Sequence, residues 1–182
     1  MSEPSSRCLP LLRHPLIISL SLAVLVSASA FRPSRTLSME MLQFRTGIVE
    51  FAQQFVGLRY RYAGKSPETG FDCSGFTSFI LGKFDTSVSC SSSLQSTQGV
   101  KVPLSEVEPG DLLFFGRKGR IQHVAMVVEH NANGIVCIHS TCSRGIIVEN
   151  VSTSSYWRSR ILFARDVLGR QLFDEATAQK IF

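Results

Sequence analysis

The chain has 182 residues, a formal net charge of +5 and a hydrophobic fraction of 44%. This length supports one hydrophobic core and is too short for two ordinary domains once a leader is removed. The basic residues are scattered and no aromatic stacking motif accompanies them, so the composition argues against nucleic acid as a partner.

Residues 1–30 have the features of a secretory signal peptide. Two arginines precede an apolar stretch over residues 16–26, and Ala28, Ser29 and Ala30 form the small-residue pattern that signal peptidase reads. The apolar stretch is too short to span a membrane. We therefore expect export to the periplasm or cell exterior and no stable membrane insertion of the cleaved chain, with an uncleaved anchor as the alternative.

An amphipathic helix is the first element predicted after the leader. Apolar residues recur every three or four positions from Leu37 to Phe55, Ser38 is placed to cap the helix, and Gly57 is placed to end it. We expect this apolar stripe to face the core rather than a partner protein.

A second, shorter helix is predicted to begin at Cys73. Phe76, Phe79 and Ile80 have helical spacing, and Gly82 offers a stop. Unpaired N–H groups and the helix dipole at such a position favour the thiolate, which is the nucleophilic form of cysteine. The two small residues that follow leave room for a substrate carbonyl, and the Cys73 N–H could bind a developing oxyanion. A buried structural cysteine is the alternative.

A hairpin in the second half of the chain carries two histidines. Residues 123–129 and 135–139 have the composition of strands, and the segment between them is a polar turn. His123 begins the first strand and His139 ends the second. His130, in the turn, is expected to be an ordinary surface residue.

The register of this hairpin decides whether the two imidazoles can meet. If Glu129 pairs with Ile135, His139 lies opposite Ala125 and diagonal to His123. Side chains alternate faces along a strand, so both rings then share one face at a backbone separation of about 7 Å. A slip of one residue would put them on opposite faces.

With both rings on one face, His123 would be the general base for Cys73 and His139 would hold the tautomer of that base. The alternative is that each histidine is an ordinary core or surface residue. Further strands are predicted near residues 112–115, 146–150 and 161–164, and residues 171–182 look helical. Helices followed by a run of strands indicate an α+β fold, with the helices packed on one side of a central antiparallel sheet.

Several short motifs follow one another in a familiar order. They are YRYAG at 60–64, GFDCSGF at 70–76, Ser92 with Gln95 and Gly99, PGDLLFF at 109–115, HVA at 123–125 and IHS at 138–140. Together they resemble the NlpC-type cell-wall DL-endopeptidase family of papain-like cysteine peptidases. The resemblance runs over about residues 40–168, within a single domain at 31–182.

The resemblance implies hydrolysis of an amide bond in peptidoglycan stem peptides, typically between D-glutamate and the diamino acid that follows, through a thioester intermediate. It implies a triad of Cys73 as nucleophile, His123 as base and His139 as orienting residue, with no cofactor and no metal. The family pattern places Tyr60 over the scissile carbonyl or the amino end of the substrate. The other expected substrate-binding residues are Asp72 and Ser92 at the free amine, and Ser74, which leaves room for the carbonyl. The alternative for Asp72 is that it serves only as a helix cap for the Cys73 turn.

Some positions depart from the family pattern and bear on specificity. Ala63 stands where the family usually has glycine, Tyr62 where it often has tryptophan, and the stretch before Ser92 lacks the usual proline and arginine. Two other functions remain open at this stage. One is an amidase or acyltransferase on the same scaffold with another substrate, and the other is a non-catalytic wall-binding module, in which Cys73, the two histidines and one more thiol could hold zinc.

Overall fold

The structure is a computed structural model, and it describes residues 39–169. The predicted signal peptide at 1–30 and the predicted helical tail at 171–182 lie outside the described residues. The elements in chain order are α1 (Met39–Gln53), β1 (Lys65–Ser66), β2 (Gly70–Phe71), α2 (Cys73–Gly82), α3 (Ser92–Gln95), β3 (Val100–Val102), η1 (Leu104–Glu106), β4 (Leu112–Arg117), β5 (Arg120–Asn131), β6 (Gly134–Thr141), β7 (Gly145–Asn150), η2 (Arg158–Arg160) and β8 (Ile161–Asp166). No helix within 39–169 is both long and apolar enough to cross a membrane.

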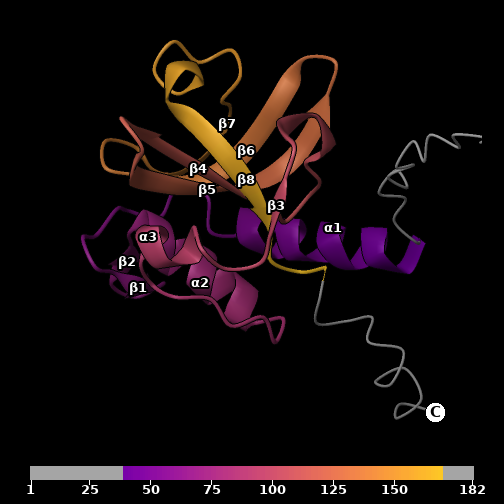
Figure 1. The fold of residues 1–182 in the computed structure, drawn as a ribbon. Helices are drawn as coiled ribbons and strands as arrows, with labels where there is room; N and C mark the ends of the chain where they lie inside the picture. The colour runs from indigo at the N-terminus through magenta and orange to yellow at the C-terminus, as the bar shows by residue number, and fades with distance from the viewer. Residues whose placement is uncertain (1–38, 170–182) are drawn as a thin grey trace, which may run out of the picture. The chain divides into compact units, whose positions relative to one another are not determined.

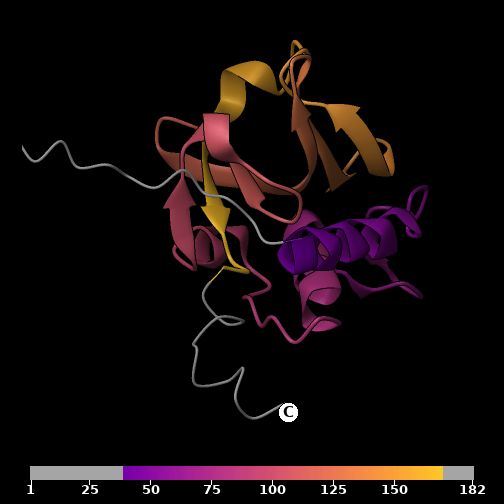
Figure 2. The same ribbon diagram turned by 90° about the vertical axis from the view of Figure 1, so that its right-hand side faces the viewer.

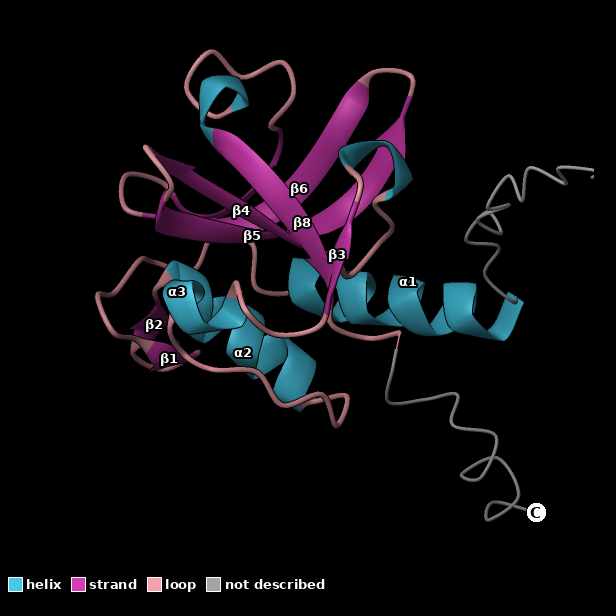
Figure 3. Ribbon diagram, viewed as in Figure 1, coloured by secondary structure: helices cyan, strands magenta, loops and turns pink. Residues whose placement is uncertain are grey.

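A six-stranded antiparallel sheet in the order β3-β8-β4-β5-β6-β7 forms the centre of the domain. The three α-helices lie below the sheet in Figures 1 and 3, together with the small β1–β2 pair. Figure 2 shows α1 and α2 side by side on that same side. The predicted α+β class and the placement of the helices on one side of the sheet are confirmed.

The two faces of the sheet carry two separate apolar clusters, because neighbouring residues of a strand point to opposite faces. Phe114, Val124 and Met126 pack with Phe76 and Ile80 of α2 in the larger cluster. The opposite face has a smaller cluster, made up of Val107, Leu113, Phe115, Ala125, Val127, Ile135, Cys137, Val151 and Ala164, with Trp157 and Ile161 packed against it. The side of the sheet away from the helices is thus closed by loops and η2.

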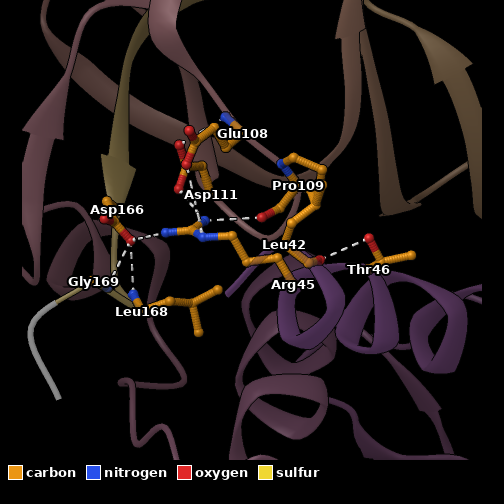
Figure 4. Close-up of polar contacts among 9 residues, drawn as sticks. All are labelled: Leu42, Arg45, Thr46, Glu108, Pro109, Asp111, Asp166, Leu168 and Gly169. Atoms are coloured by element: carbon orange, nitrogen blue, oxygen red, sulfur yellow. Dashed lines mark hydrogen bonds and ion pairs between the residues drawn. The ribbon is translucent and has the colours of Figure 1, made fainter. Parts of the chain in front are cut away.

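The first helix holds a residue that its apolar stripe does not predict. Arg45 is fully buried, and its guanidinium donates to Asp111 at 2.8 Å, to Asp166 at 2.7 Å and to the carbonyl of Pro109 at 2.9 Å. Figure 4 shows the side chain reaching from α1 to the ends of β4 and β8. A buried cation is tolerated only with such direct partners, so these bonds tie α1 to the sheet.

The second helix begins where the sequence predicts. Asp72 is its N-cap, and the Asp72 carboxylate accepts a 2.6 Å hydrogen bond from the Gly75 amide. Gly75 also sits so close to the carbonyl of Gly64 that a Cβ would be 2.1 Å from its oxygen. The start of α2, with Cys73 in its first turn, is therefore held by a cap and by a tight backbone contact.

The predicted hairpin register is correct near the histidines and wrong at the turn. Met126 pairs with Ile138, as expected, but Ile135 pairs with His130 rather than with Glu129. A β-bulge between Val127 and Glu129 inserts one residue into β5 and absorbs the difference. Counting back from the turn could not reveal the bulge, yet the register on the far side of it equals the predicted one.

Candidate active site

His123 and His139 meet on one face of the sheet. Nε2 of His123 lies 2.9 Å from Nδ1 of His139, and the two ring centroids are 5.0 Å apart. Trp157 covers both rings, stacked on His123 at 4.6 Å between centroids. Phe115, opposite His123 on β4, closes the other side. Of the residues that contact His123, Phe115 belongs to the smaller apolar cluster and Trp157 packs against it.

Glu149 of β7 continues this chain of hydrogen bonds. One of its carboxylate oxygens, Oε1, lies 3.0 Å from Nε2 of His139 and accepts from Trp157 Nε1 at 2.9 Å and from Arg144 at 2.7 Å. Burial opposes ionisation of Glu149, but the bonds from Arg144, His139 and Trp157 outweigh it and lower its pKa. Glu149 is therefore a carboxylate at neutral pH.

The ionised Glu149 fixes the tautomers of both histidines. A carboxylate only accepts hydrogen bonds, so Nε2 of His139 must carry a proton and its Nδ1, in the neutral ring, must accept. Nε2 of His123 must then donate to it. The free lone pair of His123 is left on Nδ1, which is the atom that can act as a base.

Both rings are neutral in the resting protein. Burial and the neighbouring His139 lower the pKa of His123 to about 3. Burial also lowers the pKa of His139, although Glu149 acts in the opposite direction. His123 therefore stays neutral, with a free ring lone pair, throughout the neutral range.

The Cys73 thiol lies against the backbone of β5 at Val124, the residue after His123. Burial raises its pKa; the backbone amides of Val124, Ser74 and Cys73 lower it and the charge of Asp72 raises it. The helix start favours the thiolate, as expected, because the backbone amides there lower the pKa of Cys73. Desolvation is the larger effect, so the pKa of Cys73 is raised overall. No hydrogen bond joins the thiol to His123, although both belong to the described part of the chain.

The four expected substrate-binding residues occupy different positions relative to the thiol. Tyr60 is half-buried, and burial and a hydrogen bond with Cys142 raise the pKa of its hydroxyl. Its backbone pairs with Phe71, two residues before Cys73. Ser92 is half-buried at the start of α3.

The side chains of Asp72 and Ser74 are hydrogen-bonded to each other. Ser74 is 5% exposed, and its hydroxyl lies 3.1 Å from Oδ1 of Asp72 and 2.9 Å from the carbonyl of Cys90. The same Oδ1 caps α2, whereas Oδ2 of Asp72 has no hydrogen bond among residues 39–169. The Ser74 hydroxyl therefore supports the loop, and one oxygen of Asp72 remains available.

Cys90, Cys137 and Cys142 are free thiols, as is Cys73. Cys137 is buried opposite Glu149, and burial raises its pKa far above the ordinary value. Within 39–169, no group of three or more His, Cys, Asp or Glu side chains is arranged to hold a metal ion.

Glu149 and Trp157 are site residues that the sequence reasoning missed. The β6–β7 hairpin pairs His139 with Ile147 and Cys137 with Glu149. The register count used for the β5–β6 hairpin, applied to this second hairpin, places Glu149 diagonal to His139 on the same face. No comparable signal exists for Trp157, which reaches the site from a loop.

The family described as NlpC/P60 matches residues 57–166. The gamma-DL-glutamyl hydrolase of Bacillus subtilis (strain 168) is 35% identical over 134 residues, 72% of this chain and 31% of that protein. The probable endopeptidase p60 of Listeria monocytogenes serovar 1/2a is 30% identical over 118 residues, 65% of this chain and 23% of that protein. This chain thus spans less than a third of the length of these two curated relatives.

Solved structures give the same picture. A crystal structure of an NlpC/P60 family protein from Bacillus cereus ATCC 10987 has a TM-score of 0.63 and 31% identity, covering 68% of this chain and 40% of that one. The NlpC/p60 domain of the peptidoglycan hydrolase SagA has a TM-score of 0.55 and 31% identity, covering 67% of this chain and 97% of that domain.

Proposed function

The chain belongs to the NlpC/P60 family, and on that premise we propose that it is a cysteine endopeptidase of the bacterial cell wall. Its substrate would be the amide bond between D-glutamate and the following diamino acid in peptidoglycan stem peptides. The observation that carries the proposal is the chain of hydrogen bonds from Glu149 through His139 to His123. The residue after His123 is Val124, and its backbone amide contacts the Cys73 thiol. The names of the relatives, a gamma-DL-glutamyl hydrolase and an endopeptidase, support the same chemistry.

In the proposed reaction, Nδ1 of His123 takes the thiol proton as Cys73 Sγ attacks the scissile carbonyl. The backbone N–H groups at the start of α2 would bind the oxyanion of the tetrahedral intermediate. The C–N bond then breaks, His123 gives its proton to the leaving amine, and a thioester remains on Cys73. Water, deprotonated by the same imidazole, hydrolyses that thioester and restores the thiol.

The resting thiol and imidazole are both neutral, so proton transfer and attack would be coupled. His139 would stabilise the protonated His123 only through its neutral ring, while Glu149 holds His139 in place. Because His139 separates His123 from the Glu149 carboxylate, His123 would stay uncharged until substrate binds.

Substrate recognition would include the free amine of a stem peptide. Oδ2 of Asp72 can accept a charge-assisted hydrogen bond from an ammonium group, worth roughly 1.5–3 kcal/mol, and Tyr60 and Ser92 would complete the amine site. We expect a free-amine tripeptide to be cleaved faster than its N-acetylated counterpart. Asp72→Asn should weaken this preference by about one to two orders of magnitude. Equal rates on both peptides in the wild type would contradict amine recognition and indicate intact, glycan-linked wall as the substrate.

Mass spectrometry of purified peptidoglycan digested by the protein tests the proposed function. The expected products are muropeptides cut after D-glutamate, with Cys73→Ala giving none. Products cut at another amide bond would instead support an amidase on the same scaffold. If no peptidoglycan gave any product, the proposal that this protein hydrolyses peptidoglycan would be contradicted.

Export is part of the same proposal, since peptidoglycan lies outside the cytoplasm. The predicted signal peptide at 1–30 would direct it there, leaving residues 31–182 in the periplasm or outside the cell. N-terminal sequencing of the exported protein should begin at Phe31. A protein that keeps residues 1–30 would contradict cleavage.

A further inference from the structure

A pocket of about 330 Å³ opens beside His123. Three of its walls are aromatic, from Phe115, Tyr156 and Trp157. Two arginines, Arg144 and Arg160, also line it, and none of the residues that line it is an aspartate or a glutamate. The pocket therefore combines an apolar interior with two cationic side chains, of which Arg144 is paired with Glu149, a residue outside the lining.

The two arginines keep hydrogen-bond donors for a ligand. The guanidinium of Arg160 lies 3.6 Å above the ring of Tyr156 and donates to the Tyr156 carbonyl. Arg144 donates to Glu149, and its side chain is 55% exposed. A guanidinium has five N–H donors in a planar fork that matches a carboxylate, so each arginine has donors to spare. Aromatic walls suit the methylene chain that would carry such a carboxylate.

The position of the pocket indicates which half of the substrate it meets. His123 lines it, and in the proposed reaction His123 hands its proton to the leaving amine. Cys73 and the residues assigned to the free amine, Asp72 and Ser92, do not line it. A group in this pocket would therefore be attached to the leaving amine rather than to the acyl half.

We propose that this pocket binds the side chain of the diamino acid on the leaving side and selects one whose end carries a carboxylate over one that ends in an ammonium group alone. This inference rests on the proposed function and adds the chemical class of the leaving residue.

Hydrolysis of three matched tripeptides tests it. All begin with L-alanine and γ-linked D-glutamate, and the third residue is meso-diaminopimelate, its side-chain carboxamide, or L-lysine. We expect kcat/KM for the diaminopimelate peptide to exceed that of each of the other two by about ten- to a hundred-fold. Because all three keep the same C-terminal carboxylate, only the side-chain carboxylate can cause the difference.

Variants of Arg160, which lines the pocket, and of Arg158, which does not, test whether the pocket causes the preference for diaminopimelate. Arg160→Gln should reduce the ratio of kcat/KM values to about one, mainly through KM, and Arg160→Lys should keep part of it. Arg158→Gln, an exposed arginine of the same η2 turn outside the pocket, should leave the ratio unchanged. Thermal unfolding checks that each variant is folded.

The outcomes separate this inference from the proposed function. Cleavage of all three peptides at similar rates, or a preference that survives in folded Arg160→Gln, would overturn the pocket assignment and leave the peptidase proposal intact. Cleavage of none of them after D-glutamate, with or without a free amine, would overturn both.

Discussion

Arg45 and His123 are both basic side chains enclosed in this domain, but only Arg45 is bonded to carboxylates. Arg45 contacts Asp111 and Asp166 directly and stays charged. His123 is bonded to a neutral imidazole, with the nearest bonded carboxylate, Glu149, one ring further away. The direct contacts of Arg45 with Asp111 and Asp166 form an ion cluster at one end of the sheet. At the site, the His139 ring separates His123 from Glu149, so His123 stays uncharged.

The difference teaches how a fold assigns structural and chemical roles to buried polar groups. Breaking a buried ion pair by removing one of its charges is strongly destabilising, because the opposite charge loses its compensation. A base must instead be able to change its charge, so it is kept apart from the carboxylate that would fix it. The two networks should therefore fail in different ways when they are mutated.

The largest effect on activity is expected at the nucleophile. Cys73→Ala should lower peptidoglycan hydrolysis by at least about three orders of magnitude and leave the thermal midpoint nearly unchanged, because only the covalent path is lost. His123→Ala should be nearly as damaging. Cys90→Ala, which removes an exposed thiol, is the matched control and should keep wild-type turnover. A Cys73→Ala protein with more than about a tenth of wild-type turnover would contradict the peptidase proposal.

Arg45→Met should have the opposite profile. It removes the guanidinium that donates to the carboxylates of Asp111 and Asp166 and should cost about 3–5 kcal/mol in the free energy of unfolding, measured with urea. Arg117→Met, at the exposed end of β4, should cost less than about 1 kcal/mol. A loss at Arg45 no greater than at Arg117 would mean that the buried cluster does not hold α1 to the sheet.

A smaller, graded loss is expected at His139. His139→Asn should lower kcat by about ten- to a hundred-fold, because an amide can still accept from His123 but its contact with Glu149 is changed. His130→Ala, at an exposed position near the end of β5 rather than in the predicted turn, should have no measurable effect. Essential His130 together with dispensable His139 would show that the bonded pair is not part of the reaction.

The pH dependence of thiol alkylation tests the neutral resting state. Because the folded pKa of Cys73 is raised, its thiolate fraction at pH 7 is small and should increase with pH through and beyond the ordinary thiol range near 8.5. Iodoacetamide labelling of Cys73, resolved from Cys90 and Cys142 by peptide mass spectrometry, should follow this rise. A rate that is already constant below pH 7 would indicate a thiolate–imidazolium pair instead.

The smallest effect is expected outside both networks, at Ala63. This residue has φ of 56°, a left-handed conformation that disfavours a side chain, so Ala63→Gly should raise the free energy of unfolding by about 0.5–1 kcal/mol. Ala132→Gly, in the hairpin turn without a positive φ, should instead lower it slightly. Destabilisation by Ala63→Gly would show that the backbone strain is offset by packing of the methyl group.

Local patterns in the sequence were sufficient to predict the α+β fold, the start of α2 at Cys73 and the shared face of His123 and His139. Helical spacing, a cap and a glycine stop act within a few residues of one another. Strand alternation likewise determines a face once a turn is located. The order of short motifs was enough to identify the family.

The tertiary structure alone decided which groups surround these residues. Arg45 is buried because it meets Asp111 and Asp166, 66 and 121 residues away in the chain, and helical spacing gives no sign of such partners. Glu149 reaches His139 across a second hairpin, and the bulge in β5 changes the pairing at its turn. The raised pKa of Cys73 follows from burial, which depends on every element packed around it and outweighs the local effect of the helix start.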